Sequence, residues 1–156
     1  MDAVIVWTDT EKKGYRSIKL KYLKEENIIP SIVHERSIYE LLIMISTICR
    51  NCSDIIDRII VVCEDEDCRI ESFLSINSSL PGLSIETVKH TELFKGFDGF
   101  LPSYSPIAIR TLLYRLKKLS EEFILFDFSC IPIKSMSKDE LVSKCDKKRK
   151  WPWMKK

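Results

Sequence analysis

The chain has 156 residues, of which 45% are hydrophobic and 31% are charged, and its formal net charge is +2. This length fits one domain that can bury a core without a disulfide or a metal, and the composition excludes a largely disordered chain. The small net charge argues against a nucleic-acid partner, because nucleic-acid-binding domains usually carry a larger, clustered basic excess.

The apolar composition of the chain and its two terminal segments bear on the cellular location of the protein. No run of apolar residues is long enough to span a membrane, and the first residues lack the basic and apolar regions of a signal peptide, so we expect a cytoplasmic protein. We expect one domain over residues 1–143 and a basic tail over residues 144–156 that contains Trp151 and Trp153. Basic residues beside Trp suit peripheral contact with a membrane surface or an acidic partner; a solvated tail is the alternative.

Short apolar runs alternate with amphipathic stretches in the first half of the chain. Residues 3–7 predict a buried strand. A capping-box pattern, Ser-x-x-Glu at residues 37–40, predicts a helix over residues 38–50. Residues 59–63 and 84–88 predict the second and third strands, because each is a short apolar or alternating run that ends in polar residues.

The second half of the chain contains one long irregular segment. Residues 90–105 include glycine, proline and several aromatic residues, and we expect a loop that its rings anchor. A Ser-Pro pair at 105–106 is typical of a helix start, and apolar residues at helical spacing follow, so a helix is predicted over residues 106–119. Residues 123–127 predict the fourth strand. The aromatic residues of the loop are Phe94, Phe97, Phe100 and Tyr104.

Strands that alternate with helices predict an α/β fold with an open, mostly parallel sheet and flanking helices. Ligands of such sheets bind outside the carboxyl ends of the strands. Acidic residues follow several predicted strands there: Asp9, Glu64 with Asp65, and Asp127. Carboxylates that gather at one edge suit a divalent cation, which would neutralise a diphosphate. A single Asp after a strand is more often a turn residue, and only the group of acids at one edge points to a cation.

The chain has 6 cysteines. We expect all of them to be reduced and without metal, because no export signal is present. Cys49 and Cys52 have the spacing that begins many zinc sites, but the following pair, Cys63 and Cys68, is poorly spaced for a zinc ribbon. Small core residues are therefore the predicted role.

Several stretches of the chain, in order, carry a family resemblance. They are DAVIVWTD at residues 2–9, the segment 40–65, LPSYSPIAIR at residues 101–110 and LSEEFILFD at residues 119–127. Together they resemble the Stealth family, which includes capsule polysaccharide phosphotransferases and N-acetylglucosamine-1-phosphotransferase. The resemblance implies a Rossmann-like fold of the glycosyltransferase type A class and a nucleotide sugar as donor.

The polar residues of these blocks differ from the family pattern, whereas the apolar framework is kept. The family's Asn-Ser-His-Ala-Ile-Glu corresponds to residues 105–110, and its Phe-Asn-Asp-Asp corresponds to residues 126–129. The resemblance therefore implies a nucleotide-sugar-dependent transferase, with a UDP-linked donor and glycosyl transfer to a glycan or polysaccharide acceptor. A Stealth-type sugar-phosphate transferase and a non-catalytic binding or scaffold domain are the alternatives.

The resemblance also implies roles for single residues. Asp9 follows the first strand, where such folds bind the base or ribose of a nucleotide. Asp127 stands where type A glycosyltransferases hold Mg²⁺ or Mn²⁺. Arg110, expected in the first turn of its helix, is a candidate ligand for the donor diphosphate. The alternatives are turn residues for the acids and a solvated helix face for Arg110.

Asp98 is the candidate general base that removes the proton of an acceptor hydroxyl. It lies in a glycine-flanked turn of the aromatic loop, and rings on a loop suit a sugar acceptor because sugar faces stack on them. An ordinary turn residue is the alternative. Asp9, Asp127 and Arg110 are expected to line one pocket at the carboxyl edge, provided that the loop over residues 90–105 wraps back to that edge.

Overall fold

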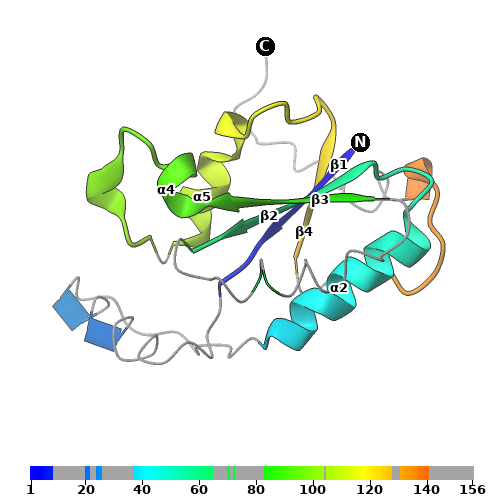
Figure 1. Cartoon of the computed structure of the whole chain (residues 1–156), viewed down its shortest axis with the longest axis horizontal. Helices are drawn as coiled ribbons and strands as arrows, with labels where there is room; N and C mark the ends of the chain where they lie inside the picture. The colour runs from blue at the N-terminus through cyan, green and yellow to red at the C-terminus, as the bar shows by residue number, and fades with distance from the viewer. Residues whose placement is uncertain are drawn as a thin grey trace, which may run out of the picture.

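The structure, a computed structural model, describes residues 1–8, 20–21, 24–25, 37–64, 70, 72, 83–103, 105–127 and 131–140. Strands and helices alternate along these ranges (Figure 1). The strands are β1 (Asp2–Val6), β2 (Arg58–Cys63), β3 (Ser84–Lys89) and β4 (Phe123–Phe126). The helices are α2 (Ile38–Asn51), α4 (His90–Leu93) and α5 (Pro106–Thr111), with 3₁₀ turns η1 (Asp98–Phe100) and η2 (Leu113–Arg115).

The described strands form one 4-stranded sheet in the order β3-β2-β1-β4, and every neighbouring pair is parallel. The central strands β1 and β2 are buried along nearly their whole length, as expected for a parallel sheet that is covered on both faces. This confirms the predicted α/β fold with a parallel sheet and is compatible with a Rossmann-like arrangement.

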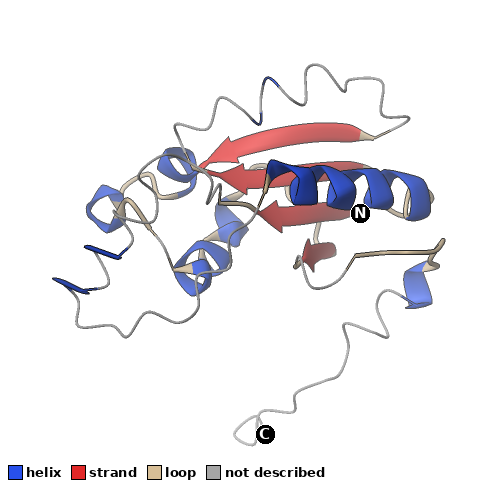
Figure 2. Ribbon diagram, turned by 90° about the horizontal axis from the view of Figure 1, so that it is seen from below, coloured by secondary structure: helices blue, strands red, loops and turns tan. Residues whose placement is uncertain are grey.

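Helices pack on both faces of this sheet. One face carries Ala3, Ile5 and Trp7 and packs against α2, whereas the other carries Val4 and packs against α4, α5 and η2. Figure 2 shows α2 running along the sheet, with the shorter helices gathered at one end. Successive strand residues point to opposite faces, so each central strand supplies both cores.

The helix predicted over residues 38–50 is confirmed as α2. Ser37 caps it by accepting a hydrogen bond from the backbone N–H of Tyr39, and Glu40 lies in its first turn. The buried residues repeat at helical spacing, so one stripe of α2 faces the sheet. This stripe comprises Leu41, Met44, Ile45 and Ile48.

The helix predicted over residues 106–119 is wrong in its length. α5 ends at Thr111 and is followed by the 3₁₀ turn η2. β-branched residues weaken a helix, and the Thr111 hydroxyl also donates to the Ile107 carbonyl at 2.8 Å. Lys118 then adopts a φ of 56°, in the left-handed region, which turns the chain toward β4. The apolar residues of the stretch still pack into one cluster: Ile109, Leu113 and Leu116.

A buried ion pair ties the strands together at the amino-terminal edge of the sheet. The Asp2 carboxylate accepts hydrogen bonds from Arg58 at 2.6 and 3.2 Å and from the Ser120 backbone N–H at 2.8 Å. Arg58 also pairs with Glu86 at 3.1 Å and donates to the Lys118 carbonyl at 2.7 Å. The hydrogen bonds from Arg58 hold the pKa of Asp2 below its usual range, against the opposing effect of burial.

Cys49 and Cys52 lie at the end of α2 and are buried in the same core as β1. Burial raises the pKa of both thiols, which disfavours the thiolate that binds metals. They are the small core residues that the sequence predicts. Cys68, Cys130 and Cys145 lie outside the described residues, so the reduced, metal-free state of all 6 cysteines stays a prediction.

The predicted tail over residues 144–156 also lies outside the described residues, and its membrane contact and the domain boundary stay predictions. Within the described ranges, no helix combines the length and the apolar composition needed to cross a membrane. The expected cytoplasmic location stays a prediction as well.

Candidate functional site

The carboxyl edge between β1 and β4 is the point where the chain changes sides of the sheet. α2, between β1 and β2, covers one face, whereas α4 and α5, between β3 and β4, cover the other. β1 and β4 are neighbours in the sheet, with Ile5 opposite Phe126. Parallel sheets bind ligands at such a switch point, outside the carboxyl ends of the strands. The next residues, Val6 on β1 and Asp127 after β4, therefore border the candidate site.

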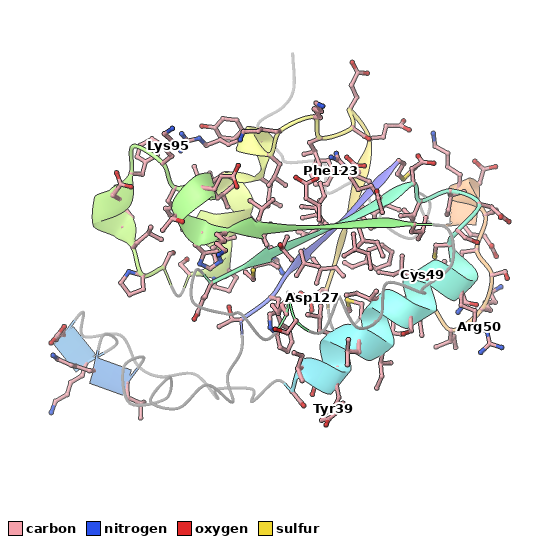
Figure 3. The ribbon with its side chains drawn as sticks, in the orientation of Figure 1. Tyr39, Cys49, Arg50, Lys95, Phe123 and Asp127 are labelled. Carbon is pink, nitrogen blue, oxygen red and sulfur yellow. The ribbon has the colours of Figure 1, made fainter. Side chains whose placement is uncertain are left out.

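Asp127 and Arg110 form an ion pair at this edge. The Arg110 Nη2 atom lies 2.9 Å from an Asp127 carboxylate oxygen, and the two side chains are 44% and 42% exposed. Figure 3 shows Asp127 just beyond the tip of β4. A pair exposed to this extent contributes only about 0–1 kcal/mol to stability, because solvent screens it. Both charges are therefore accessible to a bound ligand.

The loop after β3 brings Arg110 to this edge, as the expected pocket requires. Arg115 holds the base of the loop: its guanidinium donates to the Leu93 carbonyl at 3.0 Å and to the Lys95 carbonyl at 2.6 Å. It also stacks on the ring of Phe97, 5.3 Å from the ring centroid. These contacts join the end of α4 to η2, which directly follows α5, and Arg110 near the end of α5 reaches Asp127 at the carboxyl edge.

Arg110 does not lie where the sequence places it within its helix. It is in the last turn of α5 rather than the first, because the helix ends at Thr111. The amino-terminal amides of α5 offer little to a phosphate: Pro106 has no N–H, and the Ala108 N–H donates to the Ser105 hydroxyl at 3.3 Å. Any anion bound here would therefore meet the Arg110 side chain rather than the helix amides.

The aromatic loop presents its rings in two different ways. Phe94 is 2% exposed and anchors the loop as predicted, but Phe97 and Phe100 are 46% and 71% exposed. Gly96, with a φ of 83°, turns the chain away from the core directly after the anchor. The expectation that these outer rings are anchors is therefore wrong. Their ring centroids lie 6.4 Å apart at an interplanar angle of 58°.

Asp98 lies on η1, between the two exposed rings in sequence, and is itself exposed. No contact among the described residues joins it to Arg110 or Asp127, so the structure does not bring the candidate base and the ion pair together. Its role stays a prediction. Figure 1 shows η1 at the far end of the loop, away from β4.

Asp9 and Asp65, two of the acids predicted to gather at this edge, lie outside the described residues. Glu64 directly follows β2 and Asp127 follows β4, which places both at the carboxyl edge of the parallel sheet. Within the described ranges, no group of three or more His, Cys, Asp or Glu side chains is placed to hold a metal ion.

Sequence reasoning missed two arginines that organise the structure. Arg58 opens β2 and neutralises Asp2, and Arg115 holds the aromatic loop. Both lie next to apolar runs and resemble solvated charges in the sequence, because their partners are remote: Asp2 is 56 residues from Arg58, and Leu93 is 22 residues from Arg115. Only the burial of Asp2 at the start of a predicted core strand offers a signal for the first pair.

No protein-family model, no curated protein and no solved structure matches the chain. The resemblance to the Stealth family therefore stays a prediction.

Proposed function

We propose that this chain binds a nucleotide sugar at the carboxyl edge between β1 and β4 and transfers the sugar to a glycan acceptor. One observation carries the proposal: the accessible Arg110–Asp127 pair lies at the switch point of a parallel sheet, where nucleotides bind in folds of this architecture. The resemblance of four sequence blocks to the Stealth family, and through it to type A glycosyltransferases, supports the same proposal.

The donor side of the site uses the ion pair. A guanidinium matches the oxygens of a diphosphate in geometry and charge, and Arg110 remains 44% exposed beside Asp127. A carboxylate such as Asp127 accepts hydrogen bonds from ribose or sugar hydroxyls. Asp9 follows β1 by three residues in the sequence and is the proposed contact for the base or ribose of the nucleotide.

The acceptor side uses the aromatic loop. Arg115 contacts the exposed ring of Phe97, and the more exposed ring of Phe100, whose centroid lies 6.4 Å from that of Phe97, presents a face on which a sugar ring can stack. In the transfer, the acceptor hydroxyl oxygen bonds to the anomeric carbon as the bond from that carbon to the diphosphate breaks. The nucleoside diphosphate leaves with the electron pair, and the hydroxyl proton goes to a base; the sequence proposes Asp98 for this role, although η1 lies apart from the ion pair (Figure 1).

Titration with UDP-sugars, followed by thermal unfolding, tests the donor proposal. A ligand present at 100 times its Kd should stabilise the fold by about 2.7 kcal/mol. Arg110→Gln should lose this stabilisation. Lys117→Gln serves as the matched control, because Lys117 is an exposed cation that pairs with Glu92 rather than with the site. A parent protein that no nucleotide or nucleotide sugar stabilises would contradict the proposal.

The alternatives differ in the product that they release. Glycosyl transfer from a UDP-sugar releases UDP, whereas sugar-phosphate transfer of the Stealth type breaks the phosphoanhydride bond and releases UMP. Binding without either product would indicate a scaffold domain. One observation favours this last alternative: the Asp127 carboxylate already pairs with Arg110, at the place where type A glycosyltransferases use a carboxylate to hold metal.

A further inference from the structure

We infer that Arg110 supplies the positive charge for the donor diphosphate, in place of a divalent cation. The inference rests on the proposed function, since it concerns the same nucleotide-sugar site. It starts from the position of the guanidinium, which lies where the fold class leads one to expect Mg²⁺ or Mn²⁺.

The residues described at this edge do not fit a metal ion. Mg²⁺ binds carboxylate oxygens at about 2.0–2.1 Å, and one carboxylate oxygen of Asp127, Oδ2, lies 2.9 Å from a nitrogen of Arg110. A dication on this carboxylate would stand close to a permanent positive charge and would be repelled by it. Within the described ranges, no cluster of three or more ligating side chains compensates for this repulsion.

Arg110 has the chemistry to neutralise the diphosphate itself. A guanidinium carries five N–H donors in a planar fork, and only Nη2 contacts Asp127 among the described residues. The remaining donors belong to a side chain that is 44% exposed, at the edge where the donor would bind. In the transfer, the same cation stabilises the negative charge that develops on the leaving diphosphate.

Asp127 is then a positioning residue rather than a metal ligand. Its carboxylate accepts a hydrogen bond from one nitrogen of the guanidinium, which holds the Arg110 side chain beside the tip of β4. Asp127→Asn keeps a hydrogen-bond acceptor of the same shape and removes the charge. It should therefore loosen the orientation of Arg110 without removing the cation.

Calorimetric titration of the whole chain with UDP-N-acetylglucosamine, UDP-glucose and UDP tests this assignment. Each ligand is titrated in excess EDTA, in Mg²⁺ and in Mn²⁺. The expected result is a Kd that agrees within about twofold across the three conditions for every ligand that binds. Arg110→Gln should weaken binding by about 10- to 100-fold, the usual range for a lost charge-assisted hydrogen bond, and Arg110→Lys should restore part of the affinity.

A double-mutant cycle tests the role given to Asp127. Asp127→Asn alone should weaken binding by a few-fold, and it should have no further effect in the Arg110→Gln background, because it acts through Arg110. Equal effects in both backgrounds would overturn the positioning role. Lys117→Gln should bind as the parent does.

The outcomes separate this inference from the proposed function. Binding that requires Mg²⁺ or Mn²⁺ and is abolished by EDTA or by Asp127→Asn would overturn the inference and leave the proposed function standing. Binding in EDTA that Arg110→Gln does not weaken would also overturn it. Absence of binding for every ligand under all three conditions would overturn the inference and the proposed function together.

Discussion

The two edges of the sheet carry the same kind of ion pair in opposite settings. At the amino-terminal edge, the side chains of Arg58 and Asp2 are 20% and 5% exposed, and Ser120 and Glu86 complete their hydrogen bonds. At the carboxyl edge, Arg110 and Asp127 are 44% and 42% exposed. The same pair of residue types is thus part of the framework at one edge and open to a ligand at the other.

The difference indicates that the amino-terminal edge contributes to the stability of the fold, whereas the carboxyl edge is available for ligand binding. A buried pair is strongly destabilising to break, since the remaining charge is left without water or a partner. Breaking an exposed pair changes the free energy of unfolding little, because solvent replaces the lost contact. A ligand can therefore bind at the carboxyl edge with little effect on the fold, and the following predictions test this contrast.

The largest effect is expected from Asp2→Ala. It removes the main partner of the Arg58 guanidinium, together with the hydrogen bond to Ser120. Arg58 keeps Glu86 and the Lys118 carbonyl, and the free energy of unfolding should fall by about 3 kcal/mol. Urea unfolding followed by circular dichroism measures this loss. Asp127→Ala is the matched control, and a loss for Asp2→Ala no larger than for this control would show that the two edges do not differ.

The pH dependence of stability should follow the same pair. The pKa of Asp2 is lowered in the folded state by the hydrogen bonds from Arg58. Its stabilising effect is therefore complete above the unfolded-state pKa of about 4 and is lost as the pH falls through the lower folded value. Urea unfolding from neutral pH to below about pH 3 should show the parent converging on Asp2→Asn. A constant difference between the two proteins would contradict this.

An intermediate effect is expected from Arg115→Ala, which removes two hydrogen bonds to loop carbonyls and the contact with Phe97. The loss should be about 1–3 kcal/mol, since the carbonyls lose a charged donor. Limited proteolysis should also cut within residues 94–103 faster than in the parent. Unchanged stability together with an unchanged cleavage rate would mean that the loop does not depend on this arginine.

The smallest effect is expected from Arg110→Gln and Asp127→Asn. Each should change the free energy of unfolding by less than about 1 kcal/mol, and added salt should reduce even this change. Urea unfolding at low and high salt measures both variants. A loss comparable to that of Asp2→Ala would mean that the carboxyl-edge pair belongs to the framework after all.

The strands and the long helix could be predicted from the sequence because their signals are local. β1 and β2 are short apolar runs, and α2 has both a capping box and an apolar stripe. α5 was predicted too long because apolar spacing continues past its end. The stretch from Leu112 to Leu116 keeps the helical period of apolar residues, yet its backbone forms a 3₁₀ turn, and its Arg115 side chain bonds to the loop after α4.

Of the site, the sequence could predict only the features that follow directly from a parallel sheet. Asp127 had to lie at the carboxyl edge once β4 was parallel to β1. The contact of Arg110 with Asp127 depends on the path of the loop after β3, and Arg115, which bonds to carbonyls of that loop, has partners 20 and 22 residues away in the sequence. Such contacts join residues that are far apart in sequence, so no local pattern encodes them.

The way in which Arg115 holds the aromatic loop also determines which of its residues can change in sequence without disturbing the fold. The loop is fastened at its base, at the carbonyls of Leu93 and Lys95, whereas a Cβ atom at Gly99, on η1, would meet nothing within 4 Å. The tip can therefore accept new side chains, and even inserted residues, without displacing Arg110 on α5. Such a chain can exchange the part that faces an acceptor while it keeps the part that faces the donor, and this makes the segment from 97 to 101 the natural place to graft a new specificity.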